Sequence, residues 1–74
     1  MKIEVRLFAT LRQDRFNKRA IDFPDGCTVT EVLDRLEIDP QDLAILLVNG
    51  RDAAADQPLK ADDVLALFPP VAGG

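Results

Sequence analysis

Apolar and polar residues alternate along residues 2–10 of the chain. The odd positions of this segment are apolar: Ile3, Val5, Leu7 and Ala9. The even positions are polar except for Phe8. A period of two is typical of a β-strand with one buried face. Residues 2–10 are therefore predicted to form a strand that carries Phe8 on its outward face.

Turn sequences delimit the next strands. Residues 19–23 are predicted as a second strand, because the Pro-Asp-Gly sequence that follows them is typical of a turn. Residues 43–48 form an uninterrupted apolar run that is short enough for a buried strand. The Asn49-Gly50 pair after this run is the strongest short signal for a hairpin, so a brief fourth strand is expected from Arg51.

A helix is predicted between the second and third strands. Thr28 and Glu31 have the spacing of a capping box, in which a side chain at each position satisfies a free backbone N–H group. The apolar residues that follow repeat at helical spacing and form one stripe: Val29, Val32, Leu33 and Leu36. Pro40 disfavours helical conformation in the residue before it, so we expect the helix to end near Glu37.

The last strand is predicted over residues 64–68, after a loop that contains Pro58 and a turn at residues 61–63. Leu65 and Leu67 are expected to face inward, and Phe68 outward. The order of elements is strand, strand, helix, strand, short strand, strand. This order predicts one α+β domain, residues 1–68, with a mixed sheet of four to five strands and one main helix on one face.

The composition is that of one small globular domain with few groups for catalysis. The chain has 74 residues, of which 47% are hydrophobic, so it can bury a small core. Histidine is absent, which removes the usual general base near neutral pH. Cys27 is the only cysteine, which excludes an internal disulfide and a cysteine-based metal site. No apolar run approaches the ~20 residues of a membrane span, so the expected location is cytoplasmic, without membrane association.

Charge is distributed unevenly along the chain. The net charge is −4, and residues 38–74 carry all of it, with two basic and six acidic side chains. An acidic half disfavours binding to nucleic acid and favours a partner with a basic docking face. For any single aspartate, a solvated surface that keeps a small protein soluble is the preferred interpretation.

Residues 69–74 differ from the domain before them and are predicted to form an extended tail. Pro69 and Pro70 favour an extended path away from the domain. At about 3.1 Å per residue, the tail reaches roughly 19 Å. Gly73 and Gly74 have no side chains, so the terminal carboxylate can enter a slot too narrow for other residues. A tail of this kind indicates a substrate for another protein's active site.

These motifs resemble the MoaD/ThiS family of sulfur carriers, and MoaD in particular. The matching segments are Leu7-Phe8-Ala9-Thr10-Leu11-Arg12, Thr28-Val29 with Glu31 and Leu33, Val48-Asn49-Gly50, Pro58-Leu59 and Phe68-Pro69-Pro70-Val71-Ala72-Gly73-Gly74. The resemblance implies a β-grasp, or ubiquitin-like, fold. One departure is Asp62, which stands where MoaD-like proteins often have a turn glycine.

The resemblance implies a function as a non-enzymatic sulfur carrier. An adenylating enzyme related to ubiquitin-activating enzymes would use ATP to adenylate the Gly74 carboxylate, and a sulfur donor enzyme would supply the sulfur of a thiocarboxylate. The large subunit of molybdopterin synthase would then place that sulfur in the molybdopterin dithiolene. The chain itself would bind no cofactor and no metal. The alternatives are a carrier for thiamine, cysteine or tRNA thiolation, a protein modifier conjugated through Gly74, and a plain interaction module.

The same resemblance implies a set of residues that contact partners. Alternation places Phe8 and Phe68 on outward faces of neighbouring strands, where exposed aromatic residues commonly contribute much of the binding energy. For Leu59, an interface role and a core role are both open. The remaining predicted contacts are Arg12 and the tail residues Pro69, Pro70, Val71 and Ala72. Cys27 is interpreted as an ordinary small residue.

Overall fold

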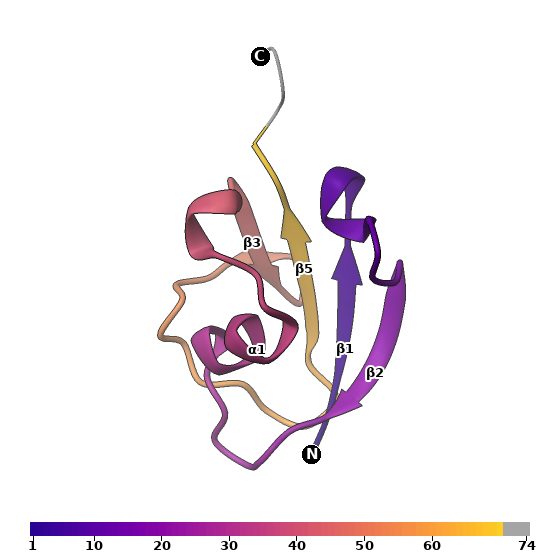
Figure 1. Ribbon diagram of the computed structural model, residues 1–74. Coiled ribbons are helices and arrows are strands. Elements are labelled where there is room, and N and C mark those ends of the chain that lie inside the picture. Colours follow the sequence, from indigo (N-terminus) through magenta and orange to yellow (C-terminus); the bar gives the residue numbers. More distant parts are fainter. Residues whose placement is uncertain (71–74) are drawn as a thin grey trace.

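The computed structural model describes residues 1–70 as a five-stranded sheet with one α-helix and two short 3₁₀ helices (Figure 1). In chain order the elements are β1 (Lys2–Leu7), η1 (Ala9–Arg12), β2 (Lys18–Asp22), α1 (Val29–Leu36), η2 (Pro40–Asp42), β3 (Ile45–Val48), β4 (Arg51–Asp52) and β5 (Val64–Phe68). This arrangement is the β-grasp fold, and it confirms the α+β class predicted from the sequence.

The strands lie in the order β2-β1-β5-β3-β4. The central pair, β1 and β5, is parallel, and the other three pairs are antiparallel. The helix α1 lies across one face of the sheet (Figure 1). The opposite face of the sheet carries no helix within residues 1–70.

The hydrophobic core fills the space between α1 and the sheet. Alternate residues of the central strands point toward the helix, and the apolar stripe of α1 points back toward them. The residues with no exposed surface are Ile3, Val5, Val29, Val32, Leu33, Leu65 and Leu67. The predicted inward positions of Leu65 and Leu67 are therefore confirmed, and the outward residue Phe68 is only half-buried.

The ends of α1 lie where the sequence predicted them, but the capping box is formed only in part, since the Glu31 carboxylate accepts from the Thr28 hydroxyl at 3.5 Å rather than from its backbone N–H group. The Thr28 hydroxyl accepts a hydrogen bond from the Glu31 amide at 3.4 Å, which satisfies a free N–H group at the first turn. Glu37 adopts a left-handed conformation at φ 58°, and the Ile38 amide donates to the Leu33 carbonyl at 2.9 Å. This left-handed termination closes the helix where the sequence predicted its end.

Two turns with positive φ shape the end of the sheet where β5 begins. Asn49 and Gly50 lie at φ 54° and 81°, the signature of a type I′ hairpin between β3 and β4. Asp62, the residue at the turn position where the resemblance implies a glycine, adopts φ 68°. The side chain of Asn49 also donates to the Asp63 carboxylate at 2.9 Å and accepts from the Val64 amide, which joins the two turns.

Two strand predictions need correction. Residues 2–10 were predicted as one strand, but β1 ends at Leu7, because Ala9 has φ 53° and begins η1. Residues 43–48 were predicted as a buried strand, but β3 spans only Ile45–Val48, and 48% of Ile45 is exposed. The uncovered outer face of the sheet explains the second error. Both faces of β3 carry apolar residues, but α1 covers only the inner face, so Ile45 stays at the surface.

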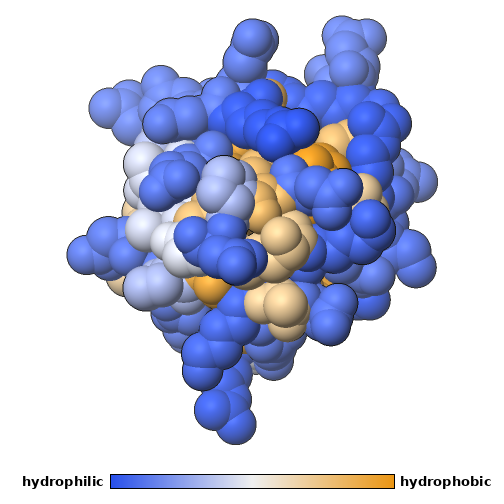
Figure 2. Space-filling model, turned by 90° about the horizontal axis from the view of Figure 1, so that it is seen from below, coloured by the Kyte–Doolittle hydropathy of each residue, from blue (hydrophilic) through white to orange (hydrophobic). Residues whose placement is uncertain are grey.

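Viewed from the end opposite the C-terminal residues of β5, the surface is mainly hydrophilic around a small apolar centre (Figure 2). No helix within residues 1–70 is long and apolar enough to span a membrane.

We expect the Leu65→Ala substitution to lower the free energy of unfolding by about 2–5 kcal/mol, because it leaves a cavity under α1. The matched control is Leu47→Ala on the outer face, where Leu47 is half-buried and the expected loss is about 1 kcal/mol. Urea unfolding of both variants measures the difference. Equal losses would contradict the placement of the core on the helix side of the sheet.

Candidate functional site

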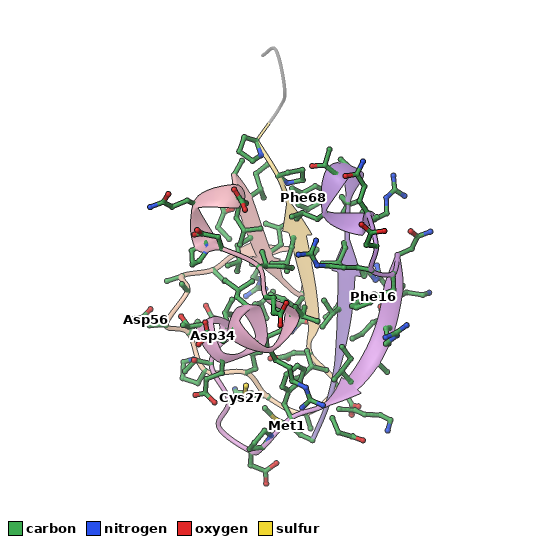
Figure 3. All side chains as sticks on the ribbon, viewed as in Figure 1. Met1, Phe16, Cys27, Asp34, Asp56 and Phe68 are labelled. Atoms are coloured by element: carbon green, nitrogen blue, oxygen red, sulfur yellow. The ribbon has the colours of Figure 1, made fainter. Side chains whose placement is uncertain are left out.

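The rings of Phe8 and Phe68 stack on each other where the sheet ends and the tail begins. The parallel register pairs Leu7 with Leu67, so the next residue of each strand falls side by side. The ring centroids are 4.2 Å apart and the ring planes differ by 9°. Figure 3 shows Phe68 at the C-terminal end of β5, next to the base of the tail. The sequence prediction of neighbouring outward aromatic residues agrees with this geometry.

Ile45 extends this aromatic pair onto the third strand. It lies opposite Phe68 in the β3–β5 register, and among residues 1–70 it is the one large apolar side chain classed as exposed. Ile45 is not among the residues predicted to contact partners. Alternation along β3 accounts for its position, because Val48 faces inward and residue 45, three positions earlier, therefore faces outward.

A groove of about 380 Å³ opens on these side chains, and we call it the apolar groove. It is lined by Phe8, Ala9, Thr10, Ile45, Phe68, Pro69 and Pro70. Its walls therefore come from three segments that the sheet brings together at the end of β5. Concave apolar surface rich in aromatic side chains is typical of the centre of a protein–protein interface.

A second groove, of about 400 Å³, lies on the helix side of the tail base. It shares Thr10, Pro69 and Pro70 with the apolar groove and adds Leu11, Arg15, Ile38 and Asp42. The two grooves together flank the point where the chain leaves the domain. A larger hollow of about 590 Å³ lies beside the β3–β4 hairpin, and its Asp63 carboxylate is occupied by bonds from the Asn49 side chain and the Lys60 amide.

Leu59 and Arg12 lie away from the apolar groove. Leu59 is 3% exposed and its amide donates to the Cys27 carbonyl at 2.8 Å. The structure thus places Leu59 in the core. Of the two roles predicted for Leu59, the core role fits this burial, because a partner contact requires an exposed side chain. Arg12 is exposed at the end of η1 and lines neither groove.

Arg15, rather than Arg12, is the basic residue that organises this end of the molecule. Its guanidinium donates to the Leu11 carbonyl at 3.2 Å, to the Leu36 carbonyl at 3.4 Å and to the Glu37 carbonyl at 3.3 Å. These bonds tie η1 to the C-terminal end of α1, where a positive charge is favourable. Arg15 thereby holds the segment that forms one wall of both grooves.

The tail is described only at its base. Pro69 is half-buried between the grooves and Pro70 is exposed. The predicted contacts at Val71 and Ala72 and the predicted reaction site at Gly73 and Gly74 lie outside the described residues. Among residues 1–70, no group of three or more His, Cys, Asp or Glu side chains is placed to hold a metal ion.

Cys27 is a buried thiol at the end of the domain remote from the tail (Figure 3). Its side chain is 2% exposed, and its Sγ donates to the Thr28 carbonyl at 3.4 Å. Burial raises the pKa of the Cys27 thiol, and the nearby Glu31 carboxylate raises it further. Both effects favour the protonated, unreactive form, which agrees with the interpretation of Cys27 as a small core residue.

The whole chain is similar to several small proteins of known structure. The model of the ThiS family matches residues 5–74. SAMP1 from Haloferax volcanii, a small archaeal modifier protein, is 30% identical at a TM-score of 0.82, with 100% of each chain covered. A protein from Pyrococcus furiosus described as subunit 1 of molybdopterin converting factor is 29% identical at a TM-score of 0.80, with 96% of this chain and 99% of that chain covered.

A structure that contains two subunits is also similar. It is the complex of subunits 1 and 2 of molybdopterin-converting factor from Helicobacter pylori, at 26% identity, a TM-score of 0.69 and 100% coverage of both chains. The search of curated proteins gives no significant match.

We expect native Cys27 to react with a thiol reagent at least about 100-fold more slowly than the same thiol in the denatured chain, because access requires local opening. Stopped-flow measurement of thiol labelling at mildly alkaline pH, with and without denaturant, gives the ratio. Similar rates in both states would show an accessible thiol and would reopen a role for Cys27 in sulfur transfer.

Proposed function

The chain belongs to the ThiS family, and from this premise we propose that it is a sulfur carrier activated at the Gly74 carboxylate. The observation that carries the proposal is the apolar groove at the base of a tail whose sequence ends in Gly73-Gly74. The groove supplies a surface for docking, and the tail supplies the reacting group. The family match runs through residue 74, so it includes both parts.

The proposed chemistry begins with activation of a poor electrophile. A carboxylate is ionised at neutral pH, and its resonance opposes attack by a nucleophile. Transfer of AMP from ATP to the Gly74 carboxylate releases pyrophosphate and gives an acyl-adenylate with a good leaving group. Sulfide (HS⁻) then attacks the carbonyl carbon and displaces AMP, and loss of the S–H proton leaves a C-terminal thiocarboxylate. ATP and the catalytic residues for these steps belong to the activating enzyme.

The absence of side chains at Gly73 and Gly74 fits a reaction inside a narrow partner site. A side chain at either position adds bulk next to the reacting carbonyl, and a small displacement there weakens catalysis strongly. The two prolines at the tail base favour an extended path, so less conformational entropy is lost when the tail is threaded into the site.

We further propose that the acceptor enzyme is the large subunit of molybdopterin synthase. Support comes from the similarity to subunit 1 in the Helicobacter pylori complex, whose partner is subunit 2 of the same factor. The similarity to the Pyrococcus furiosus protein points the same way. In this role the thiocarboxylate sulfur goes to the dithiolene of molybdopterin, and the acid–base residues belong to the large subunit.

A second function, conjugation to proteins, is favoured by the similarity to SAMP1, which is a modifier protein. In that role, a lysine amine of the target protein replaces sulfur as the nucleophile, and Gly74 becomes amide-linked. Both functions need the same activation of Gly74, so they differ only after it, in the nucleophile that attacks the acyl-adenylate and in the final acceptor. Amide-linked adducts of the chain in cell extracts would favour the modifier, and a stable complex with a synthase subunit would favour the carrier.

We expect Gly74→Ala, or one residue added after Gly74, to reduce adenylation by about 100-fold or more while the domain stays folded. ATP–pyrophosphate exchange with a MoaD-activating enzyme measures this step without the later sulfur chemistry. The matched control is Ala61→Gly in the remote turn, which leaves the tail unchanged. An extended tail adenylated as well as the native one would contradict the narrow-site argument.

We expect Phe8→Ala to weaken binding to the activating enzyme about 10-fold or more, because it removes half of the stacked pair in the apolar groove. The control is Phe16→Ala, the same truncation at a half-buried aromatic residue beside β2 (Figure 3). Isothermal titration with both variants, after their fold is checked by circular dichroism, gives the comparison. Equal affinities for Phe8→Ala and the native chain would place the docking surface elsewhere.

A further inference from the structure

The strand β2 presents an open edge of the sheet. It pairs with β1 on one side, and the strand order leaves its other side without a partner in residues 1–70. The Leu7 amide donates to the Asn17 carbonyl at 2.9 Å, and the Phe23 amide donates to the Met1 carbonyl at 2.8 Å. Bonding alternates along an antiparallel strand, so the odd residues of β2 bond to β1 and the even residues point their backbone groups outward.

The even residues of β2 are Lys18, Ala20 and Asp22. The outward direction of their backbone groups agrees with the bond from Arg35 Nη1 to the Asp22 carbonyl at 3.0 Å, which comes from the helix side of the edge. That carbonyl retains a second lone pair. The remaining outward groups have no backbone partner in the described part of the chain. The edge is therefore ready to accept an antiparallel strand.

The sequence of this edge is complementary to itself. We propose that β2 pairs with β2 of a second copy of this chain, antiparallel and with Ala20 on the two-fold axis. In this register Lys18 faces Asp22 of the second copy, and Asp22 faces Lys18. Directly opposite residues of the same face interact, so both ends of the contact join opposite charges. The residues that face each other are also those whose backbone groups point outward, so the backbone bonds form in the same register.

The charges of β2 also explain why this edge does not pair with every other exposed strand. Charged side chains on an edge strand oppose the approach of most other strands. In β2 they oppose any register that sets Lys18 near Arg19 or Lys18 of the other copy, and they favour the one centred on Ala20. The small side chain of Ala20 permits close approach at the two-fold axis.

The pairing leaves the candidate functional site free. β2 lies on the far side of β1 from β5, and the tail continues from β5 (Figure 1). A two-fold axis perpendicular to the strands places the C-terminal ends of the two β5 strands at opposite ends of the dimer. The contact is small, so the dimer is expected to be weak and dependent on concentration. The inference does not rest on the proposed function.

The test is sedimentation equilibrium of the full chain, with the charge-reversal variants Lys18→Asp and Asp22→Lys measured alone and mixed. The native chain is expected to dimerise reversibly. Each variant alone sets like charges opposite each other at both ends and is expected to dimerise about tenfold more weakly. An equimolar mixture restores opposite charges at both ends, so it is expected to regain the native affinity as a heterodimer.

The matched control is Arg51→Asp, a charge reversal on the opposite edge strand β4, which leaves the dimer constant unchanged. Amide hydrogen exchange gives a second readout, since the Ala20 amide gains protection with concentration while the Arg19 amide, already bonded to β1, does not. A native chain that stays monomeric up to millimolar concentration overturns the proposal. So does a mixture of variants that associates no better than each variant alone.

Discussion

The parallel pairing of β1 with β5 is the constraint on which the rest of the molecule depends. It joins the first and last strands at the centre of the sheet, and its inward residues, such as Val5 and Leu65, form the floor on which α1 packs. The same register sets Phe8 beside Phe68 on the outer face. The pairing that closes the core thus also brings together the walls of the apolar groove, which we propose as the docking surface, and places the end of β5 at the middle of the sheet.

Within residues 1–70 the single α-helix, α1, covers one face of the sheet and leaves the other exposed. Apolar residues on the exposed face, such as Ile45, are left uncovered by the described part of the chain. They gather beside the tail base, where a partner that receives the tail can cover them. Arg15 holds the wall of this surface in place through carbonyl groups of η1 and α1. The core therefore lies on one face of the sheet, and the proposed docking surface lies on the other.

The fold was largely predictable because its local signals are strong and agree with one another. The capping residues of α1, the Asn49-Gly50 turn and the alternation in β5 each predicted an element that the structure contains. The errors arose where contacts between distant segments decide the end of a strand or the burial of a residue. Ala9 leaves the strand through a left-handed turn that alternation does not reveal, and Leu59 is buried where its segment bonds to Cys27, which is distant in the sequence. Ile45 was missed because an apolar run was interpreted as buried.

The central claim is that Gly74 carries sulfur, and intact mass spectrometry of the purified chain tests it most directly. The chain is incubated with ATP, a MoaD-activating enzyme and a sulfide source. The account predicts a mass gain equal to the replacement of one oxygen by sulfur, and no gain in a chain that lacks Gly74. An unchanged mass, with an activating enzyme that thiolates its own carrier under the same conditions, would contradict the claim.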